Sequence, residues 1–118
     1  MNFTYIASDN TASAATALGA AGQDVLVKKV IFGLPADGKG LVIYNKAVAF
    51  GHASGIGSVD SANRAAFISQ PTAAAGKDWV REVDFTGLGN PGLQVDGGAV
   101  HTDASQVTIV WELADQAN

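Results

Sequence analysis

The sequence predicts an all-β domain, an antiparallel β-sandwich of jelly-roll type with about seven or eight short strands. Three observations support this prediction. Apolar and polar residues alternate in several runs that are rich in β-branched and aromatic residues, as expected of strands with one buried face. Turns that contain glycine or proline separate these runs at intervals of about eight to twelve residues. No segment carries the apolar stripe of a helix that packs on a core.

Three strands are expected in the first half of the chain. Phe3–Ala7 is expected to be a short strand or an extended arm. The Ala-rich segment Thr11–Gly22 lacks an apolar stripe and is expected to be a loop or a flexible edge. Asp24–Phe32 (DVLVKKVIF) has the β-branched composition of a strand. Leu34–Gly40 (LPADGKG) has the proline and the Asp-Gly pair of a turn, which predicts that Leu41–Asn45 is the hairpin partner of the preceding strand.

Five further strands are expected in the second half of the chain. Phe50–Asp60 (FGHASGIGSVD) is rich in glycine and is expected to be a long loop. Gly87–Gly92 is expected to be a tight corner, and Asp96–Gly98 (DGG) predicts the turn of a second hairpin. The five strands are expected at Asn63–Gln70, Trp79–Phe85, Leu93–Val95, Ala99–Thr102 and Ser105–Leu113.

Alternation along the strands also predicts the core. Residues on the apolar face of each strand are expected to point inward. Asp24–Phe32 is an exception, because both of its faces are largely apolar, whereas a strand of a sandwich needs only one. The second face would be covered by a loop, by Thr11–Gly22 or by another chain. The expected core residues are Val25, Val27, Ile31, Ile43, Val83, Phe85, Val107, Ile109 and Trp111.

The length of the chain predicts one domain over residues 1–118, because 118 residues are close to the common size of a single hydrophobic core. Residues 1–10 are a possible N-terminal arm, and residues 114–118 are expected to be a frayed tail. Only 15% of the residues are charged, fewer than in most soluble domains. Such a surface suits a subunit that packs against neighbours.

Composition argues against several classes of partner. The net charge of −4 and the pI near 4.8 argue against a nucleic-acid partner, which would require clustered Lys and Arg. No apolar run approaches the roughly 20 residues of a membrane-spanning helix, and Met1–Asn10 lacks the basic start and apolar core of a signal peptide. The chain has no cysteine, which excludes disulfides, cysteine nucleophiles and cysteine-based zinc sites.

The residues that could carry chemistry form no catalytic or metal-binding pattern. His52 and His101 are the two histidines, and because they lack the spacing of metal ligands they are expected to be exposed in loops. Glu82 and Asp84 share a strand face and are expected to be solvated beside Arg81. The sequence therefore predicts no catalytic, cofactor or metal site.

Exposed aromatic side chains on a sandwich would instead favour sugar binding. Trp79 and Trp111 lie on the apolar faces of their strands and are expected to pack in the core. Tyr5 and Tyr44 are possible surface platforms. A carbohydrate-binding module is thus an open alternative.

Three features resemble a family of small jelly-roll proteins of tailed bacteriophages. They are the strand Ile43–Asn45 (IYN), the corner formed by Phe85, Gly92 and Leu93, and the last strand Val107–Glu112 (VTIVWE). Members of that family are virion components, such as capsid decoration proteins and head fibres, and are often trimers. The resemblance implies a homotrimer on the capsid surface, made in the host cytoplasm, with the major capsid protein as its partner. The longer corner at Gly87–Pro91 departs from the family pattern.

These observations lead to the hypothesis of a non-enzymatic virion protein that decorates and cements a phage capsid by bridging capsid subunits. The alternative is a carbohydrate- or receptor-binding sandwich of a phage fibre or knob. No cofactor is expected in either case. The possible interface residues lie in the N-terminal arm and on the second face of Asp24–Phe32, and they are Phe3, Tyr5, Ile6, Leu26, Val30 and Phe32.

Overall fold

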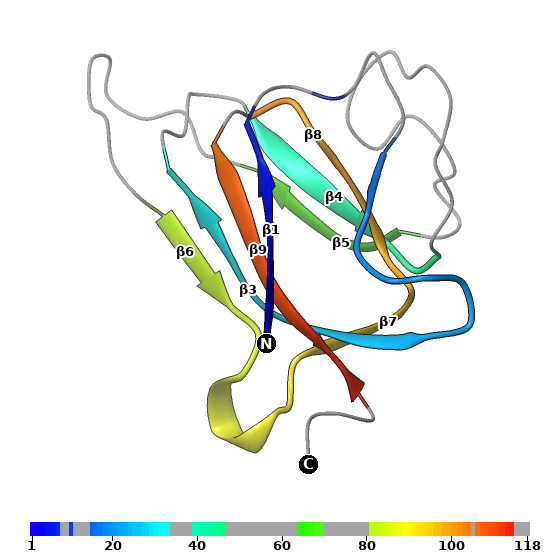
Figure 1. Cartoon of the computed structure of the whole chain (residues 1–118). Coiled ribbons are helices and arrows are strands. Elements are labelled where there is room, and N and C mark those ends of the chain that lie inside the picture. The colour runs from blue at the N-terminus through cyan, green and yellow to red at the C-terminus, as the bar shows by residue number, and fades with distance from the viewer. Residues whose placement is uncertain are drawn as a thin grey trace.

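The computed structural model shows two antiparallel β-sheets packed face to face (Figure 1). It describes residues 1–7, 10, 15–33, 39–46, 64–69, 81–104 and 106–114. Within these ranges it contains nine strands, a short 3₁₀ turn and no α-helix. These elements are β1 (Asn2–Ile6), β2 (Thr16–Ala17), β3 (Asp24–Phe32), β4 (Gly40–Tyr44), β5 (Arg64–Ser69), β6 (Arg81–Asp84), η2 (Gly87–Gly89), β7 (Leu93–Asp96), β8 (Ala99–Thr102) and β9 (Val107–Leu113).

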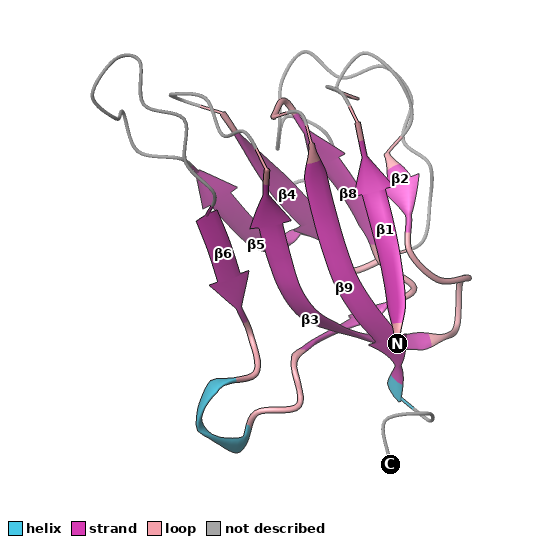
Figure 2. Cartoon of the chain, turned by 60° about the vertical axis from the view of Figure 1, so that its left-hand side comes forward, coloured by secondary structure: helices cyan, strands magenta, loops and turns pink. Residues whose placement is uncertain are grey.

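The strands are paired in a nested order. Sheet A has the order β1-β9-β3-β6, with β7 paired to the first half of β3, and sheet B has the order β2-β8-β4-β5. The first strand thus pairs with the last, β2 pairs with β8, β3 pairs with β6, and β4 pairs with β5. Figure 2 shows the two sheets facing each other, with β1 and β6 at opposite edges of sheet A. This is the strand order of a jelly roll, so the predicted all-β sandwich is confirmed.

Both predicted hairpins are wrong. β3 and β4 lie in different sheets, and so do β7 and β8. Gly97 and Gly98, both with positive φ, carry the chain from one sheet to the other rather than between two paired strands. Turn residues predict where the chain reverses, but they do not determine whether the next strand joins the same sheet or the opposite one. The nested pairing of a jelly roll sends these two strands across the sandwich.

A β-bulge in β3 explains why that strand is apolar on both apparent faces. Its pairing with β9 shifts between Val27 and Lys29, so that one extra residue is inserted on the β3 side. An extra residue reverses the alternation of faces beyond it. Val25 and Val27 before the bulge and Val30 and Phe32 after it therefore all point into the core. The expected division of faces is therefore corrected: the inner face is apolar throughout, and the outer face keeps Leu26 and Ile31 beside Lys29.

The core lies between the two sheets. Most of the expected core residues either are buried there or pack against buried residues, including Trp111, which is half-buried. Ile31 is the exception, because the bulge turns it to the outer face, where it is half-buried. The buried cluster consists of Ile6, Leu18, Val25, Val27, Val30, Phe32, Leu41, Ile43, Ile68, Val95, Val100, Ala104, Val107 and Ile109.

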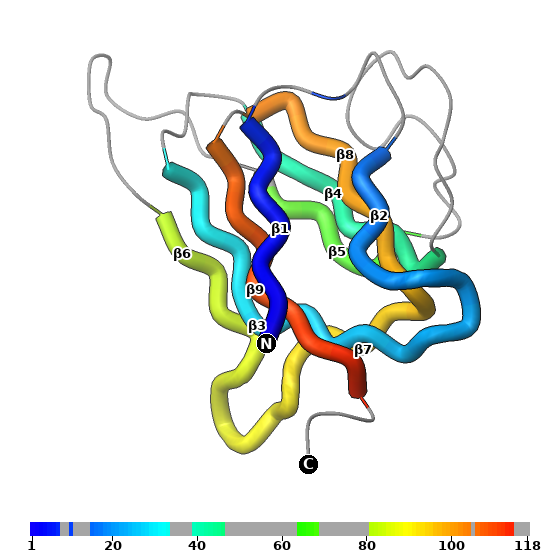
Figure 3. The backbone as a smooth tube through the Cα atoms, in the orientation of Figure 1, coloured from blue at the N-terminus to red at the C-terminus, as the bar shows by residue number. Residues whose placement is uncertain are grey.

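The start of the chain is a strand of sheet A rather than a loose arm. β1 pairs with β9 over its whole length (Figure 3). Asn10 then ties the chain to β8: its side-chain amide donates to the carbonyl of Val100 at 3.0 Å and its side-chain oxygen accepts from the N–H of Thr102 at 2.7 Å. β2 lies within the segment that was expected to be a loop, and it adds a strand to the predicted set. The expected tail is described only at Ala114; residues 115–118 lie outside the described residues.

Candidate interface at the edge of sheet A

The outer face of β1 carries the N-terminal strip, which consists of Met1, Phe3 and Tyr5. Phe3 lies opposite Val110, and Tyr5 lies opposite Thr108. Residues paired across an antiparallel ladder share a face, so both aromatic side chains stand on the outside of sheet A. The side chains of the strip are 70%, 70% and 60% exposed, in chain order. Phe3 and Tyr5 thus project from β1 into solvent, and Met1, which precedes the strand, is exposed as well.

The opposite face of β1 belongs to the core. Ile6 is buried in the cluster between the sheets. Thr4 lies opposite Ile109, and its hydroxyl accepts a hydrogen bond of 2.9 Å from the indole N–H of Trp111. The inner side of β1 therefore fixes the position of the strand, and the strand presents the N-terminal strip outward.

β1 is an edge strand, and within the described residues its ladder partner is β9 alone. Every second residue of an edge strand directs its N–H and C=O groups away from the sheet, where they can pair with another strand. β1 (NFTYI) contains no charged residue and no proline, the residues that commonly prevent such pairing. This edge therefore combines available backbone groups with an exposed aromatic surface.

The other edge of sheet A is charged. β6 (REVD) places Glu82 opposite Ile31 and Asp84 opposite Lys29. Lys29 Nζ lies 3.1 Å from Glu82 Oε1. Asp84 Oδ1 accepts hydrogen bonds from the hydroxyl and the backbone N–H of Thr86, and these bonds, the hydroxyl first, lower the pKa of the Asp84 carboxyl. This edge keeps charge in the position where an incoming strand would pair.

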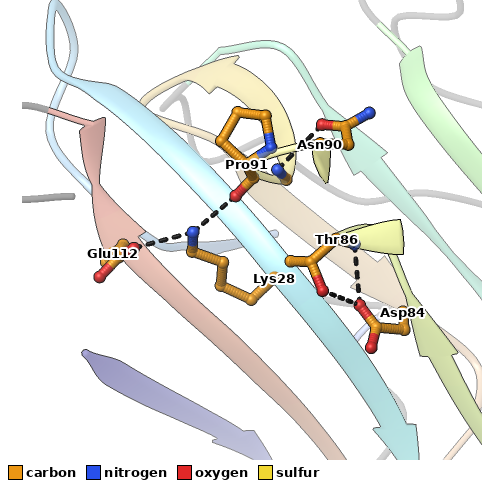
Figure 4. Close-up of polar contacts among 7 residues, drawn as sticks. Lys28, Asp84, Thr86, Asn90, Pro91 and Glu112 are labelled. Carbon is orange, nitrogen blue, oxygen red and sulfur yellow. Dashed lines mark hydrogen bonds and ion pairs between the residues drawn. The ribbon is translucent and has the colours of Figure 1, made fainter. Parts of the chain in front are cut away.

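The corner after β6 is held in place by polar contacts at its base (Figure 4). The ammonium of Lys28, the bulge residue, donates to the carbonyl of Pro91 and forms an ion pair of 2.8 Å with Glu112. Gly92 then approaches β3 so closely that a Cβ there would lie 2.8 Å from the carbonyl oxygen of Val27. Leu88, at the tip of the corner, is fully exposed and has a φ of 59°. The corner is thus held at its base while its tip makes no core contact.

Phe3 and Tyr5 have the exposure that the predicted interface requires, but the rest of the predicted set is buried within the chain. Side chains that are covered within one chain offer no surface to a second, and the bulge turns Val30 and Phe32 to the inner face of β3. The buried members of the predicted set are Ile6, Leu26, Val30 and Phe32.

Tyr44 and His101 correct two further expectations, because neither is exposed. Both are completely buried on the outer side of sheet B, where Tyr44 joins a small cluster with Ala15, Val42 and Ala99. The Tyr44 hydroxyl lies 3.5 Å from His101 Nδ1, and the two rings meet edge to face with centroids 5.8 Å apart. Tyr44 is therefore not a sugar platform, and His101 is not a loop histidine. His101 falls within β8, whose four residues are all buried.

The described residues contain no cluster of three or more His, Asp or Glu side chains that could hold a metal ion. A pocket of about 250 Å³ lies beside Gly22, Gln23, Asp24 and Leu113, and it is smaller than most ligand sites. His52, Trp79 and the glycine-rich loop at Phe50–Asp60 lie outside the described residues. In the described part of the chain, no helix is both long enough and apolar enough to cross a membrane.

Comparison with known proteins gave no match: no family model, no curated protein and no solved structure is significantly similar to this chain.

Proposed function

We propose that the protein is a non-enzymatic structural component of a phage virion that self-associates and decorates the capsid by bridging capsid subunits. The observation that carries the proposal is the N-terminal strip, an exposed apolar surface on an uncharged edge strand of a jelly roll. Exposed apolar patches on soluble proteins commonly mark contacts with other proteins. The resemblance to small phage jelly-roll proteins supplies the virion context, and it implies a trimer.

Decoration of this kind requires a rigid body with contact surfaces rather than a reactive centre. The sandwich provides the rigid body, because both sheets are closed against a continuous core. Each subunit that bridges two capsid proteins adds the free energy of its contacts to the cost of separating them. Stable contacts of this type commonly bury at least about 1,200 Å² in total. The low content of charged residues is in keeping with a protein that covers much of its surface in an assembly.

The proposal is tested by locating the protein on particles. Antibodies raised against the purified chain should label intact virions of the phage that encodes it, and particles from a deletion of the gene should remain unlabelled. Decorated particles should also withstand heat or chelator better than particles from the deletion. Intact virions that carry no copy of the protein would refute the proposal.

A second candidate function is sugar or receptor binding by the same strip, favoured by the exposure of Phe3 and Tyr5 on one face. Tyr44 no longer supports this function because it is buried. Binding to an array of glycans, lost in the Tyr5→Ala variant and retained in Phe67→Ala, would favour this candidate. Phe67 is a suitable control because it is a half-exposed aromatic side chain on the other sheet.

A further inference from the structure

We infer that two copies of the chain pair through their β1 strands, antiparallel and centred on Thr4, so that the two A sheets join into one continuous sheet. This inference rests on the self-association part of the proposed function, and it gives a closed two-fold dimer in place of the trimer that the resemblance implies. It names the occupant of the β1 edge as a second copy of the same strand. The backbone edge of β1, the side chains that such pairing brings together and the contrast with β6 all favour this contact.

The backbone of β1 is able to accept a strand. The strand is extended over five residues, lacks proline and has β9 as its ladder partner within the described residues. An antiparallel partner can pair with the groups that β1 directs away from β9. A two-fold axis through Thr4 pairs the strand with itself and closes the contact, so that no open edge of β1 remains for further chains.

The side chains of β1 are complementary to themselves in this register. With Thr4 opposite Thr4 of the second copy, Phe3 of each copy lies opposite Tyr5 of the other. All four rings then stand on the outer face of the joined sheet, where aromatic pairs across antiparallel strands are favourable. A register shifted by one residue would place apolar groups opposite the inward-facing ones. The sequence of the strip therefore favours one alignment.

Charge permits a second copy at the β1 edge but not at the β6 edge. The chain carries a net charge of −4, so the repulsion between two copies is smallest where uncharged surfaces meet. β1 is such a surface, whereas two β6 strands would bring Glu82 and Asp84 of both copies together. A neutral aromatic strip on an acidic protein thus permits self-contact at this edge and discourages it at the other.

The expected contact is small. A contact between two five-residue strands is expected to bury less than the roughly 1,200 Å² of total area that characterises stable complexes. The dimer is therefore expected to dissociate on dilution through the micromolar range, and high local concentration on a shell would favour it. Sedimentation equilibrium of the full chain should show a reversible change between 12.0 kDa and twice that mass.

Charge substitutions test the contact. The double variants Phe3→Glu/Tyr5→Glu and Phe3→Lys/Tyr5→Lys should each dissociate at least about tenfold more readily than the wild type, because like charges oppose one another across the ladder. An equimolar mixture of the two should associate again, which shows that both variants are folded. Phe67→Lys, on sheet B, is the matched control and should dimerise as the wild type does.

Cross-linking tests the register. The chain has no cysteine, so a single introduced cysteine reports one contact. Thr4→Cys should form a covalent dimer under mild oxidation, because directly opposed residues lie within disulfide reach. Tyr5→Cys should not, because residue 5 lies opposite residue 3 of the other copy, and the two copies of residue 5 would be about 7–8 Å apart on the diagonal, beyond disulfide reach.

The outcomes separate this inference from the proposed function, because these measurements use the chain alone in solution. A wild-type chain that stays at 12.0 kDa at millimolar concentration, or a three-chain species that the charge variants leave unchanged, would overturn the β1 pairing. Neither result would bear on whether antibodies label virions. A chain that dimerises through β1 but is absent from virions would support the β1 pairing and refute the proposed role on the capsid.

Discussion

The two edges of sheet A differ in charge and in the apolar side chains that they expose. β1 exposes Phe3 and Tyr5 and carries no charge, whereas β6 carries three charged residues in four positions. Proteins commonly block exposed strand edges with charge to prevent unwanted pairing. From this contrast we expect pairing to be disfavoured at β6 and permitted at β1. The predictions below test that difference, beginning with the largest expected effect.

The two faces of β1 should respond very differently to truncation. Ile6→Ala removes a buried side chain from the core and should cost about 2–5 kcal/mol of unfolding free energy. Tyr5→Ala, one residue away on the exposed face, should cost less than about 0.5 kcal/mol. Chemical denaturation of both variants at a concentration where the chain is monomeric would measure the difference. Equal losses would mean that the strip belongs to the fold rather than to a contact.

Lys28 and Lys29, which are neighbours in β3, form ion pairs that should contribute unequally to the stability of the fold. Lys28 and Glu112 are 15% and 16% exposed, whereas Lys29 and Glu82 are 35% and 48% exposed. Glu112→Ala removes the carboxylate that pairs with the largely buried ammonium of Lys28, and it should lower the free energy of unfolding by about 1–3 kcal/mol. Glu82→Ala should cost less than about 1 kcal/mol, because the pair near β6 is screened by solvent. Thermal unfolding in low and high salt would separate the two, since salt should affect mainly the exposed pair.

Removing charge from β6 should make that edge resemble β1. Glu82→Thr/Asp84→Thr, introduced into the Phe3→Glu/Tyr5→Glu background, should restore association that depends on concentration, with little change in stability. The edge at β6 would then lack its acidic residues and keep only Arg81 as a charged residue. Light scattering of the two variants at matched concentrations is the measurement. If this β6 variant remains monomeric, the two acidic residues are not what prevents pairing at that edge.

The smallest effect concerns Asp84 at the charged edge. The hydroxyl of Thr86 is the main cause of the lowered pKa of Asp84, and Thr86→Val should raise this pKa toward the ordinary value. A carboxyl with a lowered pKa in the folded state stabilises the protein above its unfolded-state pKa. That contribution is lost as the pH falls through the folded-state pKa. An NMR titration of the Asp84 carboxyl carbon would show the shift, and Thr86→Ser, which keeps the hydroxyl, should leave it unchanged.

Much of the fold could be predicted because alternation reports which side of a strand is buried. The positions of Val107 and Ile109 in the core follow directly from that pattern. Pairing between distant strands could not be predicted, because nothing local to Asp96–Gly98 shows that β8 joins the opposite sheet. The bulge at Lys28 was also invisible, since one extra residue changes faces without changing composition.

The candidate interface was partly predictable. Phe3 and Tyr5 stand in alternate positions in an uncharged run, a pattern that is visible in the sequence. The burial of Tyr44 and His101 was missed because sheet B is covered on its outer side as well as its inner side, so the usual expectation of one solvated face does not apply to it. The difference in charge between β1 and β6 is visible in the sequence, but its meaning depends on knowing that both strands lie at sheet edges.

The nested pairing of the strands has a consequence for how the protein folds. Asn2 pairs with Trp111, and Thr16 pairs with Val100, so the first strands to leave the ribosome must wait for the last. Such distant contacts slow folding and favour completion after synthesis rather than during it. While β9 is still being made, β1 has neither its ladder partner nor its core, and both of its faces are exposed. During this interval, the β1 strands of two unfinished chains are able to pair with each other, as we infer they do in two finished copies. A chaperone that covers β1, or rapid synthesis of β9, would limit such premature pairing.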